Sequence, residues 1–131
     1  MITVGMSNER SVWVESKNTA VSMGSGTLPV FATPAMILLA EQAASECLIP
    51  ELQDGESSVG ILVNMKHTSP SLVGAKVTCR AEVKEVDRAR VVFDVVVSDD
   101  HGVIGTGAHE RFIIKADRFM SKAEERTASS G

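Results

Sequence analysis

The sequence predicts an α+β fold in which a curved antiparallel sheet of about five strands wraps around one long central helix. Residues 36–48 are apolar on almost every face, so a helix there must be buried on nearly all sides. Residues 77–84 and 91–97 alternate apolar and polar side chains, with the period of two that is typical of half-buried strands. Between the later strands lies the tetrapeptide DDHG, which favours a tight hairpin turn.

The central helix is expected over residues 34–49. Thr33 is a suitable N-cap, Pro34 fits the first helical turn, and Pro50 does not support continuation. The preceding segment at residues 23–29 reads MGSGTLP, a flexible loop in the position of a lid.

The remaining elements are predicted mainly from alternation. We expect a first strand at residues 9–15 that residues 17–21 extend, a polar turn at 51–58, and a strand at 59–65. A loop follows at 69–74, and the last strands cover 77–84, 90–98 and 103–115. Gly105 and Gly107 in the last strand indicate close backbone approach or a bulge. One domain therefore spans residues 1–118, and residues 119–131 form a polar, frayed tail.

Bulk composition restricts the class of protein. The chain of 131 residues is long enough for one domain with a real core, and its net charge of -4 argues against a nucleic-acid binder. The N-terminus lacks the basic start and apolar run of a targeting segment, and the apolar helix is too short to span a membrane. Cys47 and Cys79 have no metal spacing and are expected to be reduced core thiols. We therefore expect a cytoplasmic protein that does not bind membranes.

Glu41 is the most unusual residue of the central helix. A carboxylate among leucines and alanines is seldom buried without a partner, although it could lie at the solvated edge beside Gln42. Thr33 could serve only as the N-cap. His67 ends an apolar strand, with a side chain suited to proton transfer near neutral pH, whereas His109 could belong to a structural ion-pair cluster with Glu110 and Arg111.

Several known types of site are absent from the sequence. The three histidines are scattered, and no metal-ligand spacing, dinucleotide-binding glycine motif, P-loop or GxSxG motif occurs. We therefore expect neither a metal nor a cofactor.

Three blocks in order resemble the hot-dog fold thioesterases, and specifically the fluoroacetyl-CoA thioesterase-like group. They are VFAT at residues 30–33 with Glu41 eight residues later, Gly60 leading to His67, and GTGAHER at residues 105–111. The resemblance implies Thr33, Glu41 and His67 as catalytic residues. It implies Phe31, Gly60 and Arg111 as substrate-binding residues, and a dimer with sites at the subunit interface.

The resemblance implies an acyl-CoA thioesterase that releases a free acid and coenzyme A, with coenzyme A present only as part of the substrate. The segment before the helix, GSGTL at residues 24–28, is smaller than the aromatic lid of the fluoroacetyl-specialised enzyme, so a short or medium acyl chain is expected. Glu41 acting as nucleophile and Glu41 acting as base for water both remain open.

Two other functions share the predicted fold. A hot-dog enoyl-CoA hydratase is disfavoured because the Asp-x-x-x-x-His pair typical of such enzymes does not occur here. A non-catalytic binder of acyl-CoA or of an acyl carrier would keep the pocket without needing Glu41. In each case one helix cannot cover both faces of the sheet, and its strands leave open edges, so a homodimer or a tetramer is expected.

Overall fold

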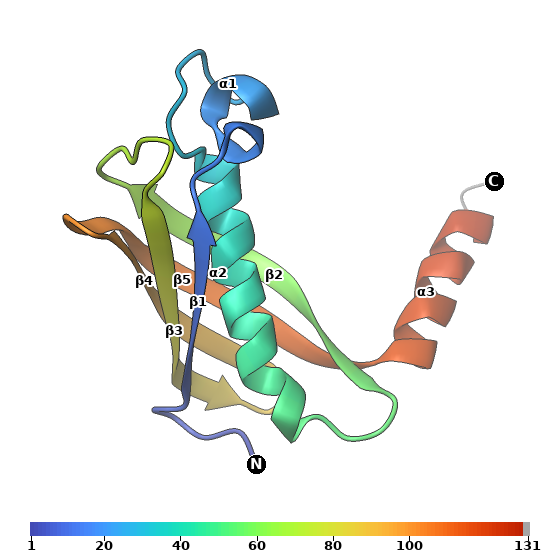
Figure 1. The fold of residues 1–131 in the computed structure, drawn as a ribbon. Coiled ribbons are helices and arrows are strands. Elements are labelled where there is room, and N and C mark those ends of the chain that lie inside the picture. The colour runs from blue at the N-terminus through green and yellow to red at the C-terminus, as the bar shows by residue number, and fades with distance from the viewer. Residues whose placement is uncertain (130–131) are drawn as a thin grey trace.

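The computed structural model describes residues 1–129 and consists of a five-stranded antiparallel sheet curved around a long helix (Figure 1). The sheet order is β1-β3-β4-β5-β2. The strands are β1 (Ser7–Trp13), β2 (Glu56–His67), β3 (Lys76–Asp87), β4 (Arg90–Asp99) and β5 (Gly102–Lys115). The helices are η1 (Ser16–Asn18), α1 (Ala20–Met23), α2 (Thr33–Leu48), η2 (Ile49–Glu51) and α3 (Ala116–Ser129).

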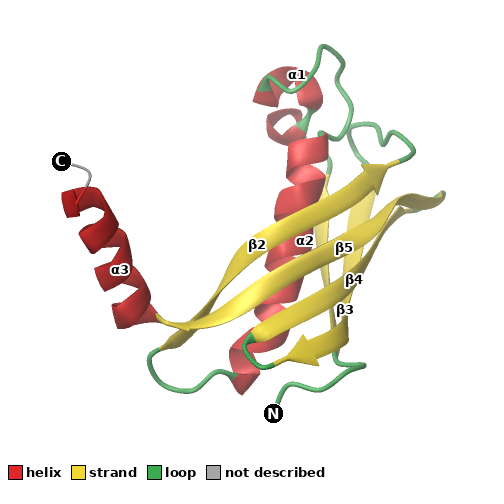
Figure 2. Cartoon of the chain, turned by 180° about the vertical axis from the view of Figure 1, so that it is seen from behind, coloured by secondary structure: helices red, strands yellow, loops and turns green. Residues whose placement is uncertain are grey.

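Helix α2 crosses one face of the sheet and supplies much of the core (Figure 2). Its buried residues recur on the face toward the strands, where alternate side chains of β3 and β4 meet them. Ala40, Ala43 and Ala44 are fully buried, and their small side chains let the helix approach the sheet closely. The predicted hot-dog architecture is confirmed.

Close packing explains the paired glycines of β5. A Cβ atom on Gly107 would collide with the carbonyl oxygen of Asn64, and one on Gly105 would lie 2.6 Å from the sulfur of Met36. The close approach predicted from sequence is therefore present on both sides of β5, toward β2 and toward α2.

Three expected segments differ from the structure. Residues 17–21 do not extend the first strand, because η1 and α1 follow β1. Strand β2 begins at Glu56, inside the expected polar turn. Residues 119–129 are not a frayed tail but most of α3, whose sequence is rich in Ala, Glu, Lys and Arg, all strong helix formers. Residues 130 and 131 of the expected tail lie outside the described residues.

Both cysteines are free and buried. Burial raises the pKa of the Cys79 thiol to about 12 and also raises the pKa of Cys47, so neither thiol ionises at neutral pH. The expectation of core thiols is confirmed. None of the helices within residues 1–129 is both long and apolar enough to cross a membrane.

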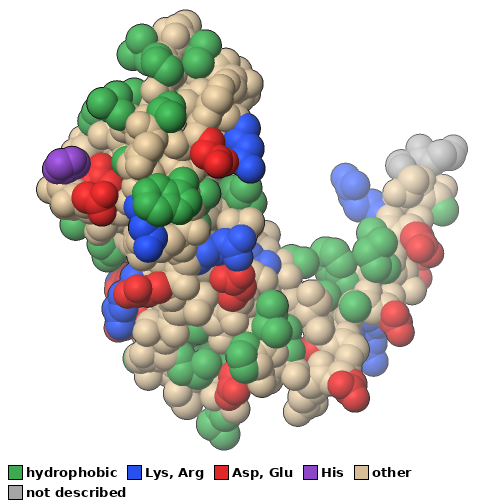
Figure 3. Space-filling model, in the orientation of Figure 1, with side chains coloured by type: hydrophobic (Ala, Val, Ile, Leu, Met, Phe, Trp, Pro, Cys, Tyr) green, Lys and Arg blue, Asp and Glu red, His purple; other side chains and the backbone are tan. Residues whose placement is uncertain are grey.

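Two features of residues 1–129 have no partner element. Strands β1 and β2 form the two edges of the sheet. Helix α3 projects away from the sheet, and hydrophobic side chains gather on its side toward the rest of the molecule (Figure 3). Phe119 and Met120 of α3 are 41% and 55% exposed.

Candidate active site

Thr33 and His67 meet at the N-terminal end of α2. Helix α2 begins at Thr33 with Ala32 at the N-cap position, so the expected role of Thr33 as N-cap is wrong. Its hydroxyl instead forms a 2.8 Å hydrogen bond with Nδ1 of His67 at the end of β2. The structure thus pairs two residues that are 34 positions apart in the chain.

The ring of His67 is held neutral and leaves one nitrogen unpaired. Burial lowers its pKa, and a backbone contact with Ser69 opposes this shift only in part. The Phe31 ring meets it edge-on, with 6.5 Å between the centroids. Among the described residues Nε2 is buried without a hydrogen-bond partner. A buried ring nitrogen of this kind is available to a ligand or to a group from a second chain.

A cavity of about 320 Å³ lies beside this pair. Thr33 and His67 line it together with Phe31 and with Ser25 from the segment before α2. The segment in the expected lid position therefore does border the cavity. Because Ala32 has no side-chain oxygen to cap α2, the first N–H groups of the helix have no side-chain partner among the described residues.

Glu41 occupies a second cluster farther along α2. Its side chain is 39% exposed, and its Oε2 lies 3.6 Å from Nη1 of Arg111 on β5. Gly60 of β2 passes directly beside it, so closely that a Cβ there would collide with Oε2. The sequence left open whether this carboxylate is buried with a partner or lies at a solvated edge. In the structure it is partly solvated and also has a charged partner.

Arg111 is anchored on three sides. Its Nε donates to Oγ of Ser58 at 2.9 Å, and its Nη2 donates to the Ser58 carbonyl at 3.0 Å. Its Nη1 lies 3.3 Å from Nε2 of His109. The sequence predicts a polar turn at Ser58, and only the pairing of β2 with β5 reveals that this residue contacts the candidate site.

The six expected site residues therefore form two groups. Phe31, Thr33 and His67 lie at the start of α2, and Glu41, Gly60 and Arg111 lie farther along it. Eight helical residues separate Thr33 from Glu41, a rise of about 12 Å. Within residues 1–129, no hydrogen bond or ion pair joins the two groups in one chain.

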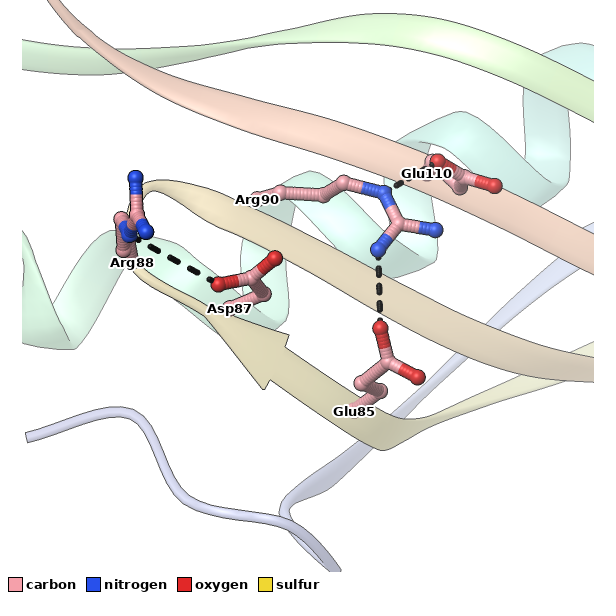
Figure 4. A network of polar contacts seen from close by, with 5 residues as sticks. All are labelled: Glu85, Asp87, Arg88, Arg90 and Glu110. Carbon is pink, nitrogen blue, oxygen red and sulfur yellow. Dashed lines mark hydrogen bonds and ion pairs between the residues drawn. The ribbon is translucent and has the colours of Figure 1, made fainter.

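The expected cluster of His109, Glu110 and Arg111 is divided between the two faces of the sheet. His109 and Arg111 are buried on the side of α2. Glu110 points the other way and accepts a 2.7 Å hydrogen bond from Arg90, which also reaches Glu85 (Figure 4). The contact with Arg90 lowers the pKa of Glu110. Alternation along β5 explains the split.

Comparison with known proteins identifies the family. A family model described as fluoroacetyl-CoA-specific thioesterase matches residues 14–117. The fluoroacetyl-CoA thioesterase of Streptantibioticus cattleyicolor is 36% identical over 98 residues, which cover 75% of this chain and 70% of the relative. The chain belongs to the fluoroacetyl-CoA thioesterase family.

Solved structures agree with this assignment. A fluoroacetyl-CoA thioesterase variant in complex with acetyl-CoA superimposes with a TM-score of 0.90 at 29% identity, covering 96% of this chain and 99% of that one. A thioesterase superfamily member from Thermus thermophilus gives a TM-score of 0.88 at 25% identity and covers 98% of both chains. The resemblance inferred from the three sequence blocks is confirmed.

Proposed function

We propose that this protein hydrolyses acyl-CoA thioesters with a short or medium acyl chain to a free acid and coenzyme A. The observation that carries the proposal is the Thr33–His67 pair beside the cavity at the start of α2, with Nε2 of His67 unpaired among the described residues. Membership of a thioesterase family supports the reaction class.

The N-terminal end of α2 provides groups that can promote thioester hydrolysis. A thioester carbonyl placed there meets the helix N–H groups and the positive end of the helix dipole, which stabilise the developing oxyanion. His67 orients water or protonates the departing thiolate, and Thr33 holds its ring through Nδ1. Glu41 attacks the carbonyl or activates water, and both routes are consistent with its partly exposed carboxylate.

A homodimer would bring the two residue groups together. Strand β2 has a free edge, and antiparallel pairing with the β2 of a second copy reverses its direction. The Gly60 region of one copy would then lie near the His67 end of the other. In this arrangement Glu41 of one subunit serves Thr33 and His67 of its partner.

Substrate range and location follow from simpler observations. The five residues 24–28 carry no aromatic side chain, which favours acyl groups other than fluoroacetyl. The two buried free thiols and the lack of disulfides within residues 1–129 fit a cytoplasmic location.

The first test measures thiol release from a panel of acyl-CoAs, with wild type beside Glu41→Gln. We expect turnover of one or a few short or medium substrates, and a loss of about 10² or more in the variant, as for removal of a general acid–base group. Glu9→Gln is the matched control, since it makes the same change at an exposed position of β1, outside the groove that Glu41 lines.

Each outcome discriminates between functions. Turnover by wild type and Glu9→Gln but not by Glu41→Gln supports the thioesterase. Acyl-CoA binding without thiol release by any of the three proteins would identify a binding protein and contradict the proposal.

A further inference from the structure

We propose that His109 is a positioning residue that keeps Arg111 beside Glu41 while preventing the two from forming a direct hydrogen-bonded pair. The inference rests on the proposed function, because it assigns a role to a residue that acts on Glu41 only through Arg111. It follows from the hydrogen bonds of a fully buried imidazole.

The tautomer of His109 is fixed by its surroundings. The ring is fully buried and stacks on Phe93, with 6.4 Å between centroids. Its Nδ1 lies 2.8 Å from the carbonyl oxygen of Leu62, which can only accept, so Nδ1 carries the proton. Burial lowers the pKa of His109, and the charge of Arg111 lowers it further, so the ring is neutral. Nε2 is therefore an acceptor and faces Nη1 of Arg111 at 3.3 Å.

One irregularity in the pairing of β2 with β5 lies beside both the Leu62–His109 contact and the Gly60–Glu41 contact. The pairing of β2 with β5 shifts register between Gly60 and Leu62. Leu62 offers its carbonyl to His109 next to this shift, and Gly60 brings the strand against Glu41. Bulges of this kind often redirect groups next to active sites.

The three neutral acceptors hold the guanidinium of Arg111 away from the carboxylate. Ser58 accepts hydrogen bonds from Nε and Nη2 of Arg111, and Nε2 of His109 accepts from Nη1. The remaining separation from Nη1 to Oε2 of Glu41 is 3.6 Å, longer than the roughly 2.7–2.9 Å of a charge-assisted hydrogen bond. Glu41 thus has a neighbouring positive charge, yet its oxygens stay free to accept a proton or attack.

No other cation of the described chain comes as close to Glu41. From β1, Arg10 lines the same open groove but pairs with Glu46. From β5, Glu110 faces the opposite side of the sheet, paired with Arg90. The remaining titratable neighbour of Arg111 and Glu41 is the ring of His109, which burial keeps neutral. Its replacement should therefore act on Glu41 through Arg111.

Two substitutions separate the two ring nitrogens. His109→Gln places an acceptor near the position of Nε2, whereas His109→Asn keeps a donor near Nδ1 and loses the acceptor for Arg111. Both substitutions remove the imidazole ring that stacks on Phe93, so the two variants lose the same stacking contact. We measure kcat, KM and kcat/KM against pH for both variants, with melting temperatures alongside.

We expect Arg111 to turn toward Glu41 in His109→Asn. A carboxylate oxygen hydrogen-bonded directly to a guanidinium is less available to attack or to activate water, so kcat falls about tenfold while KM changes little. His109→Gln keeps a higher kcat than His109→Asn. Glu110→Gln, on the outer face next to His109, is the control for general damage to β5.

A wild-type kcat in His109→Asn, or equal kcat losses in the two His109 variants that follow their melting temperatures, would show a purely structural role and overturn the inference. Failure of the proposed function is distinct, because wild type itself would then release no thiol.

Discussion

At the level of single residues, Gly60 is a backbone position that packs directly against Glu41. A methyl group there would collide with Oε2 of Glu41 and lie 3.1 Å from the ring of His109 and 3.3 Å from Arg111. The group hit hardest is the far end of a flexible side chain, so the carboxylate moves rather than the strand. We therefore expect Gly60→Ala to fold but to lower kcat/KM by about tenfold or more, since small displacements of catalytic groups cost about 10²-fold.

Acyl-CoA turnover and the melting temperature together test this expectation. Ser57→Ala, an exposed change on the same strand, should alter neither. Wild-type turnover in Gly60→Ala would mean that the position of Glu41 has little effect on the reaction.

At the level of elements, the sequence was informative where one periodicity dominates. Helix α2 is apolar on nearly all faces, β3 alternates as far as Val83, and β4 alternates from Val91 to Val97, so each could be located from side-chain pattern alone. Helix α3 was missed because its polar composition resembles a frayed end, although its residues favour helix.

The candidate site was less predictable, because its contacts join distant strands. The pattern around Thr33 indicated a cap, and only the end of β2 brings His67 within reach of its hydroxyl. Likewise, nothing local to Ser58 shows that it binds Arg111 across the β2–β5 pair. Hydrophobic periodicity in the sequence locates the helices and strands, whereas the register of strand pairing determines which side chains come into contact.

The hairpin between β4 and β5 is tied to the loop after β2 by one carboxylate. Oγ of buried Ser71 donates to Asp99 at 2.7 Å, and the backbone N–H of His101 donates to the same carboxylate at 2.8 Å. The Ser71 carbonyl in turn accepts from the N–H of Phe31, just before α2. This contact therefore connects the hairpin with the start of the helix.

Asp99 should make folding stability depend on acid. The hydrogen bond from Ser71, followed by that from His101, lowers the pKa of Asp99 in the folded state. Its contribution is present above the unfolded value of about 3.9 and is lost as pH falls through the lower folded value. Asp99→Asn should therefore be less stable than wild type at pH 7, with the difference shrinking below about pH 4.

Urea unfolding between neutral and acidic pH measures this difference. Asp100→Asn, at the exposed neighbouring position of the turn, controls for the change in net charge. A difference between Asp99→Asn and wild type that is independent of pH would show that the carboxylate charge does not stabilise the hairpin.

At the level of the whole molecule, the separation of the two residue groups is the strongest argument for a shared site. One chain holds Thr33 with His67 and, about 12 Å along the helix, Glu41 with Arg111. The free edge of β2 lies beside both groups, because this strand carries Gly60 and His67. The apolar side of α3 is also exposed (Figure 3).

Complementation between inactive variants tests the shared site. Glu41→Gln and His67→Ala are co-expressed with different tags, and mixed dimers are isolated by two affinity steps. If Glu41 of one subunit serves His67 of the other, each mixed dimer has one fully intact site and one doubly altered site. Its activity should then be about half that of wild type, because the two sites of a symmetric dimer are equivalent. If both residues act within one chain, every site carries a substitution and the mixed dimer stays inactive, while a doubly tagged wild-type dimer is active.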